Sequence, residues 1–257
     1  MPNENIIFEQ PVSERVRTLL RLEFLFARLA HHRADDSEWG LRASVDALVD
    51  VLSLFSRNDL KTEILRELND KQQALDALSD HPGVDLSVLK STLTDLASMR
   101  EQLQGLSSQQ ISQALKDSDF LLAIIQRSTI PGGTGPIDMP GYHHWLHAPD
   151  GRARRDLDHW IGQVGPFEQA VGLYLRLLRQ SSGWQQVETG DGMYVHGGQD
   201  KFQLIRIRVD GQNGVYPEIS AGRQRFTVRL VSRTSARDKD VRQVSEPLTF
   251  GLSLCSL

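Results

Sequence analysis

Four arginines near the C-terminal end of the chain stand at positions that a β-strand would place on one face. They are Arg223, Arg225, Arg229 and Arg233. Successive side chains of a strand alternate between its faces, so the apolar Phe226, Val228 and Leu230 would point the opposite way. Side chains on one face repeat every ~6–7 Å, which is less than the Debye length of ~8 Å, so these cations repel one another unless an anion offsets them. Guanidinium groups bind carboxylates and phosphates in forked geometry, and we therefore expect an acidic ligand.

The charge of this region differs from that of the whole chain. Residues 201–237 contain eight basic and two acidic groups, a net charge of +6, whereas the chain has 29 Lys+Arg against 33 Asp+Glu and a net charge of −4. The average alone argues against a nucleic-acid binder, but it conceals the basic segment. The alternative interpretation is a solvated edge-strand face whose basic groups block aggregation.

Other motifs that could support catalysis lack the residues that would complete them. His143 and His147 have the i, i+4 spacing of a zinc pair, but the sequence shows no third ligand. The glycines at 132–135 match neither a P-loop nor a dinucleotide fingerprint. The Ser-x-x-Lys match at 87–90 has no partner motif. The sequence therefore predicts no catalytic residue, no metal site and no cofactor.

Length and composition restrict the class of protein. A chain of 257 residues can bury a core without disulfides or metals. Its only cysteine, Cys255, is expected to be a buried residue, and a chain that cannot form an internal disulfide fits a reducing compartment. Since there is no run of ~18 apolar residues and no signal-peptide pattern, we expect a cytoplasmic protein without membrane insertion.

The elements that must position these residues begin with helices. Apolar residues recur at helical spacing between polar or Pro/Gly-containing breaks, and Ser13 and Asp85 are predicted N-caps. The predicted helices cover about 13–29, 41–55, 60–78, 86–103 and 107–115. Such helices with short connections form a bundle, and a second apolar stripe on them could pair with a second copy of the chain.

The rest of the chain is predicted to be mainly strands. After a turn-rich break at 130–136, short helices are expected at 142–147 and 154–164, and Pro166 is predicted to begin another helix. The predicted strands cover 5–10, 184–188, 193–196, 202–210, 216–220, 223–233 and 248–255, with a hairpin turn at 189–192. The expected fold class is α+β, an N-terminal helical bundle domain plus an antiparallel β-strand domain with inserted helices.

Short segments along the chain resemble, in order, those of the ZapD family of cell division proteins. They are 7–11 (IFEQP), 14–18 (ERVRT), 21–25 (RLEFL), 61–68 (KTEILREL), 82–85 (PGVD), 130–133 (IPGG), 144–147 (HWLH), 216–220 (YPEIS) and 225–229 (RFTVR). The resemblance implies a non-enzymatic cytoplasmic homodimer at the midcell division ring. It implies that the dimer binds the acidic C-terminal tail of the tubulin-like protein FtsZ, and cross-links and bundles FtsZ filaments.

The resemblance also implies domains and site residues. It implies a helical dimerisation domain at 19–117 and a tail-binding β-strand domain formed by 1–18 and 118–257. Arg225 and Arg229 match arginines of the family's binding pocket, Arg223 falls where relatives carry a basic residue, and Arg233 extends the same face. Relatives can add an arginine from the helix before residue 130, but this chain has KDSDF at 116–120, and that role is not transferred.

Two other classes of function use residues already named. A nucleic-acid-binding module could use the same arginine face, and competition between an FtsZ tail peptide and an oligonucleotide would separate the two. A hydrolase could use the histidine-rich region at 143–159, which metal analysis would test. The FtsZ-binding interpretation is preferred, and no nucleic acid is expected as a partner.

Overall fold

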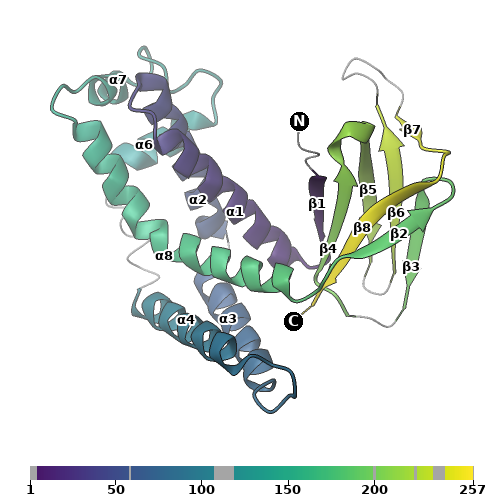
Figure 1. Ribbon diagram of the computed structural model, residues 1–257. Helices are drawn as coiled ribbons and strands as arrows, with labels where there is room; N and C mark the ends of the chain where they lie inside the picture. Colours follow the sequence, from purple (N-terminus) through teal and green to yellow (C-terminus); the bar gives the residue numbers. More distant parts are fainter. Residues whose placement is uncertain are drawn as a thin grey trace. The chain divides into compact units, whose positions relative to one another are not determined.

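The computed structural model describes residues 5–57, 59–106, 119–198, 201–222, 225–233 and 241–256 (Figure 1). These residues form an α+β fold, which confirms the predicted class. The chain divides into two compact units. One is the helical unit, Leu19–Tyr174, and the other is the β unit, which combines Met1–Thr18 with Leu175–Leu257. The helix predicted at 107–115 lies outside the described residues.

Seven helices are present in the described part of the chain. They are α1 (Glu14–Arg33), α2 (Glu38–Arg57), α3 (Leu60–Asp76), α4 (Leu86–Gly105), α6 (Asp119–Ser128), α7 (Pro140–Leu146) and α8 (Arg152–Gln180). Each contributes apolar side chains to the interior, among them the fully buried Leu22, Leu48 and Leu68. None of the described helices combines the length and apolar character needed to cross a membrane.

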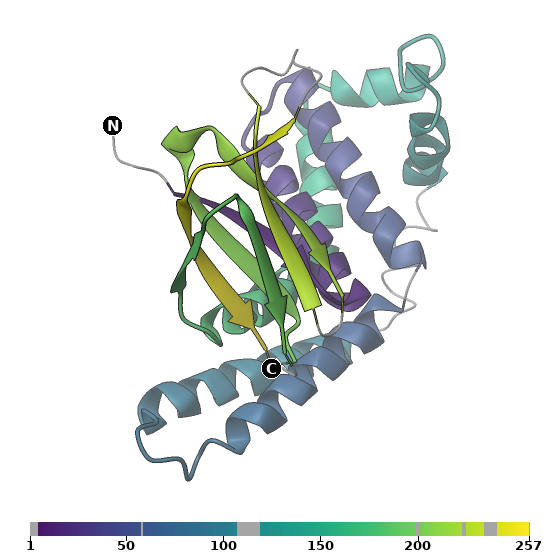
Figure 2. The ribbon, with the colours of Figure 1, turned by 90° about the vertical axis from the view of Figure 1, so that its right-hand side faces the viewer.

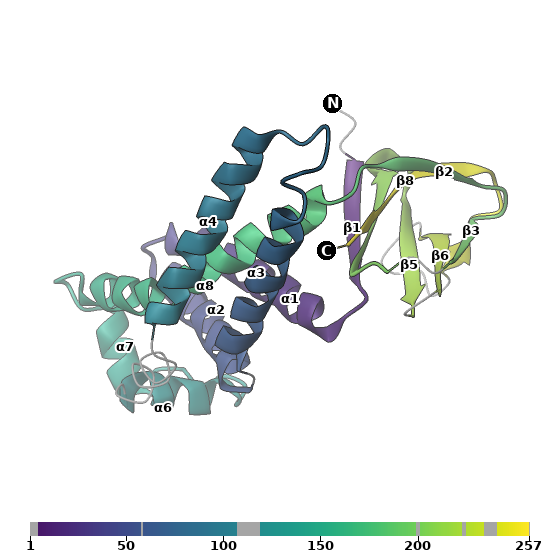
Figure 3. The ribbon, with the colours of Figure 1, turned by 90° about the horizontal axis from the view of Figure 1, so that it is seen from below.

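Local capping explains where several helices begin. The Ser13 hydroxyl accepts a hydrogen bond from the Val16 amide at 3.2 Å. The Asp85 carboxylate accepts from the amides of Ser87 and Val88 at 2.9 and 3.2 Å. Both caps were predicted, since each satisfies amides that have no partner within the first turn of a helix. The helix that Asp85 caps, α4, lies beside α3 (Figure 3).

An aromatic cluster joins α6, α7 and α8. The ring of Phe120 lies 6.0 Å from that of Tyr142, 5.4 Å from that of Trp145 and 6.3 Å from that of Trp160. The indole of Trp145 also donates a hydrogen bond to Asp156 at 2.9 Å. The helical unit extends to Tyr174, beyond the boundary predicted between residues 117 and 118.

The prediction of a helix start at Pro166 is wrong. Helix α8 is continuous from Arg152 to Gln180 and contains the proline in its interior. Proline removes one amide donor, and its ring crowds the carbonyl four residues earlier, which usually bends the helix. Here the residue four positions earlier is Gly162, which has open space around it, and α8 is drawn with a bend (Figure 1).

The β unit contains two antiparallel sheets (Figure 2). The strands are β1 (Asn5–Pro11), β2 (Gln185–Thr189), β3 (Met193–Gly197), β4 (Leu204–Asp210), β5 (Val215–Ala221), β6 (Arg225–Ser232), β7 (Arg242–Gln243) and β8 (Leu248–Cys255). The first sheet has the order β1-β4-β8-β2. The second has the order β3-β6-β5, and β7 also pairs with β6.

The predicted hairpin at 189–192 is also wrong. Strand β2 pairs with β8 in the first sheet and β3 pairs with β6 in the second, so the connection crosses between sheets. Gly192 has a φ of +71°, and a Cβ atom there would lie 2.3 Å from the carbonyl oxygen of Val244. A glycine is thus needed here because the backbone has a positive φ and passes close to another segment. A hairpin turn also requires glycine, so the sequence looks the same in both cases.

The two sheets share one apolar core. Its buried members come from β4, β6, β8 and the segment before β4, and they include Ile207, Phe226 and Phe250. Strands β2 and β8 lie on one side and β3, β5 and β6 on the other (Figure 3). The predicted alternation along β4 is confirmed, since Ile205, Ile207 and Val209 are buried in this core.

An ion-pair network covers the outer side of the first sheet. The Glu9 carboxylate accepts hydrogen bonds from Arg179 at 2.8 and 2.7 Å and from Arg206 at 2.9 Å. Arg206 and Arg208 lie over the Trp184 ring at 4.9 and 4.7 Å. These two arginines of the basic segment thus contact side chains of their own sheet.

Candidate functional site

The arginine-bearing strand β6 is held on both sides. It pairs with β5 along one edge and with β3 and then β7 along the other, so its register is fixed. Phe226, Val228 and Leu230 point into the core, where each is at most 1% exposed. The alternation of a strand then directs Arg225, Thr227 and Arg229 to the outer face.

Arg229 has a carboxylate partner directly across the sheet. Glu218 of β5 is its register partner, and Glu218 Oε2 accepts from Arg229 Nε at 3.1 Å and from Nη2 at 2.5 Å. Both side chains are 44% exposed, so the pair lies at the surface. This geometry demonstrates that the Arg229 fork can bind a carboxylate above the sheet.

Arg225 lies in a different environment. It is exposed, and the residue opposite it on β3 is Gly197, which has no side chain to cover it. No ion pair joins it to another residue within the described ranges. Four residues along a strand span ~13 Å, so Arg225 and Arg229 form two separated cationic positions on one surface.

The structure brings together only part of the predicted arginine set. Arg233 is exposed and follows directly after the end of β6, while Arg223 lies outside the described residues. The alternation also ends at Val231, which would face outward with Arg229 if the alternation continued but is fully buried. Val231 pairs with Gln243 of β7 and with Tyr216 of β5 at this end of the strand.

Two apolar residues adjoin the arginines and were not predicted as part of the site. Met193 and Val195 of β3 are 42% and 47% exposed and stand opposite Arg229 and Thr227. The alternation along β3 could have identified these two residues. Tyr194 packs inward, 6.1 Å from the Phe226 ring, so its neighbours must point outward. We call the surface formed by Arg225, Thr227, Arg229, Met193 and Val195 the basic face.

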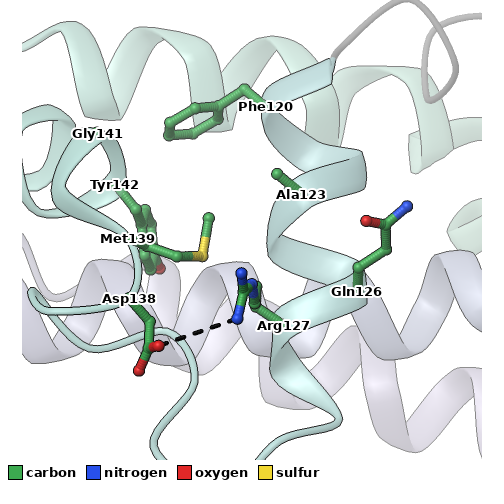
Figure 4. Close-up of a pocket in the computed structure, with 8 residues that line it drawn as sticks. All are labelled: Phe120, Ala123, Gln126, Arg127, Asp138, Met139, Gly141 and Tyr142. Atoms are coloured by element: carbon green, nitrogen blue, oxygen red, sulfur yellow. Dashed lines mark ion pairs between the residues drawn. The ribbon is translucent and has the colours of Figure 1, made fainter.

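A pocket of about 420 Å³ lies between α6 and the segment that begins α7 (Figure 4). Its lining residues are Phe120, Ala123, Gln126, Arg127, Asp138, Met139, Gly141 and Tyr142. Arg127 and Asp138 form an ion pair at 3.9 Å. Burial raises the pKa of the Tyr142 hydroxyl well above its usual value, so this group stays neutral. The lining residues contain no nucleophile paired with a base, and the pocket does not suggest catalysis.

Most of the motifs that were rejected as catalytic have structural roles in the fold. The Ser87 hydroxyl donates to the capping carboxylate of Asp85 at 2.8 Å, and Lys90 is exposed on the same helix. Gly132 adopts a φ of +75° in the turn before α7. Cys255 is buried, as expected. His143 and His147 differ from these, because the fold places the carboxylate of Glu38 beside them and so supplies a third group that could bind a metal.

Comparisons with known proteins agree on one family. The family model described as "ZapD: Cell division protein" matches residues 20–229. The chain is 37% identical over 255 residues to the cell division protein ZapD of Bordetella petrii, which covers 98% of this chain and 99% of the relative. It is 34% identical to the proteins of that name from Bordetella pertussis and Chromobacterium violaceum, again over at least 97% of each chain.

Proposed function

Because this chain belongs to the ZapD family of cell division proteins, we propose that it is a non-enzymatic division factor that binds FtsZ and cross-links its filaments. The proposed ligand of each subunit is the acidic C-terminal tail of FtsZ. The proposed binding residues are Arg225 and Arg229, together with Arg223 and Arg233. The protein would act in the cytoplasm at the midcell ring, as a homodimer and without a cofactor.

The observation that carries this proposal is the composition of the basic face. Exposed Arg225 and Arg229 lie on the same surface as exposed Met193 and Val195. A peptide with carboxylates and apolar side chains could satisfy both kinds of group at once. The forked contact of Arg229 with Glu218 provides a precedent for how a tail carboxylate would bind.

The mixed character of the face favours a peptide over a nucleic acid. Phosphate backbones are bound by many cationic contacts, and the described part of this face offers two arginines beside a carboxylate and two apolar side chains. A disordered tail must be ordered on binding, so the affinity of a single site is expected to be modest.

Cross-linking follows from bivalency. A dimer that carries one tail site in each subunit can hold two filaments. Since each filament displays many tails, the second contact benefits from a high effective concentration. We assign dimerisation to the helical unit, and the mass of the full-length chain in solution tests that assignment.

The experiment compares charge-reversed variants of the full-length protein. Arg225→Glu and Arg229→Glu, singly and together, should abolish co-sedimentation with FtsZ polymers and weaken binding of a labelled FtsZ tail peptide. Arg66→Glu is the matched control, because Arg66 has a side chain 68% exposed in the helical unit. Undiminished bundling by the double variant would refute the site. Displacement of the peptide by an oligonucleotide would favour the nucleic-acid alternative.

A further inference from the structure

We propose that Glu38, His143 and His147 form a binding site for a divalent transition-metal ion, with Zn²⁺ as the best match. A ring nitrogen of each histidine and a carboxylate oxygen of Glu38 lie within 4.8 Å of one another. Two histidines and one carboxylate are a frequent ligand set for zinc that leaves a fourth position for water. The site is contained in the helical unit and is separate from the basic face.

The helices bring these ligands together from distant parts of the sequence. His143 lies on α7 and His147 immediately follows it, so the i, i+4 spacing places both rings on one side, with centroids 4.3 Å apart. Glu38 is the first residue of α2, and Nε2 of His147 lies 3.3 Å from its Oε2. Two ligands bound at about 2.0–2.1 Å to a tetrahedral zinc ion are about 3.3–3.4 Å apart. The observed separation therefore equals one edge of such a site.

Hydrogen bonds around the ligands leave the metal-facing atoms free. Nδ1 of His147 lies 2.9 Å from the carbonyl oxygen of His143. A carbonyl can only accept, so Nδ1 carries a hydrogen, and Nε2 presents its lone pair when the ring is neutral. Arg42 donates from Nε to the other oxygen of Glu38 at 2.9 Å, which leaves Oε2 for an ion. Partners of this kind orient the ligands in protein metal sites.

Two features of the site call for a positive charge. A neutral Nε2 lone pair and a carboxylate oxygen repel one another at 3.3 Å, so the contact needs a cation between the atoms or a proton on the ring. Nδ1 of His143 is buried and has no hydrogen-bond partner in the described part of the chain. A buried nitrogen without a partner is unfavourable, and a metal bound through it would remove that penalty.

The adjacent guanidinium of Arg42 reduces the affinity of the site for cations. However, Arg42 also donates to the carbonyl of Thr134 at 3.1 Å and lies over the Tyr142 ring at 5.0 Å, so its charge is shared among several groups. We therefore expect the site to bind zinc with micromolar rather than picomolar affinity. The bound ion would link the start of α2 to α7.

The test uses the full-length protein without an affinity tag, stripped with EDTA and titrated with ZnCl₂ by calorimetry. We expect one zinc ion per chain, and a visible absorption spectrum when Co²⁺ is used instead. At a hundredfold excess of free zinc over Kd, the melting temperature should rise by roughly 5–10 °C. Glu38→Gln and His147→Ala should each weaken binding by at least about 100-fold.

His159→Ala is the matched control, because His159 is exposed on α8 and its ring forms a hydrogen bond with Gln163, outside the proposed site. Glu38→Gln keeps the size of the side chain, so it reports on ligation even if a histidine variant misfolds. Absence of saturable zinc binding would overturn the proposal and indicate that His147 and Glu38 form a simple ion pair. Equal binding by wild type and Glu38→Gln would overturn it as well. FtsZ binding is not needed for any of these measurements, so this proposal and the proposed function can fail independently.

Discussion

Arg229 and Glu218 stand directly opposite each other on neighbouring strands, and two nitrogens of Arg229 donate to one carboxylate oxygen of Glu218 on the exposed face of the sheet. Glu218 thus occupies the guanidinium that an acidic ligand would need. An intramolecular carboxylate at this position would compete with the proposed acidic ligand. It also lowers the repulsion between the arginines of the basic face while no ligand is bound.

Glu218→Gln should therefore tighten binding of an acidic peptide. Exposed ion pairs contribute about 0.2–1 kcal/mol, so removing the competitor should increase affinity between about 1.5- and 5-fold. Fluorescence anisotropy with the FtsZ tail peptide at several salt concentrations measures this change. Glu188→Gln is the control, because Glu188 is exposed on β2 of the other sheet. Weaker binding by Glu218→Gln would mean that Glu218 positions Arg229 rather than competing for it.

Local rules of sequence predicted the elements well. The caps at Ser13 and Asp85 were predictable because they depend on amides within the next three residues. The inward set on β6 was predictable for a similar reason, since alternation is a property of a single strand. The rule failed at Val231, because the burial of that residue depends on what surrounds this end of β6 rather than on its own sequence.

Features that depend on distant segments were not predictable. The glycine signal at 189–192 could not distinguish a hairpin from a crossing between sheets, because Gly192 meets a residue far along the chain, Val244. Glu38 also lies far from His143 along the chain, so spacing alone could not identify it as a third ligand. The apolar residues of the basic face were not predicted, because a methionine such as Met193 looks like a core residue unless it is known which face of its strand is buried.

The glycine at the crossing between sheets should tolerate no side chain. Gly192→Ala would force a non-glycine residue to a φ of +71° and place its Cβ 2.3 Å from the Val244 carbonyl oxygen. We expect a loss of at least about 1–2 kcal/mol in the free energy of unfolding. Gly190→Ala is the control, since a Cβ there meets nothing within 4 Å. Similar urea midpoints for both variants would contradict this account.

The cap at the start of α4 should weaken in acid. Hydrogen bonds from Ser87 and Val88 lower the pKa of the Asp85 carboxyl below its usual value. Because the folded-state pKa is the lower one, the cap stabilises the helix above the unfolded pKa and is lost as pH falls through the folded pKa. Hydrogen exchange of α4 amides, compared with wild type at each pH, measures this contribution. Asp85→Ala should speed exchange at neutral pH. Asp85→Asn should retain much of the cap without its pH dependence, and an unchanged acid response in that variant would refute the assignment.

Loss of the hydroxyl group should change the free energy of unfolding differently at two buried tyrosines of the helical unit. Tyr174 and Tyr142 are 1% and 2% exposed. The hydroxyl of Tyr174 donates to the buried carboxylate of Glu67 at 2.7 Å, whereas that of Tyr142 has no hydrogen-bond partner in the described ranges. Tyr174→Phe leaves a buried carboxylate oxygen without this donor and should lower the free energy of unfolding by about 1–3 kcal/mol.

Tyr142→Phe removes only a hydroxyl that is already unsatisfied, so we expect a change within about 0.5 kcal/mol, or a gain in stability. Both variants delete a single oxygen from a ring of the same size, and packing differences therefore cancel in the comparison. Urea denaturation of the full-length protein measures both free energies under the same conditions. If Tyr142→Phe were as destabilising as Tyr174→Phe, the penalty would arise from the space left by the deleted oxygen, and the hydrogen bond to Glu67 would not account for the stability of this region.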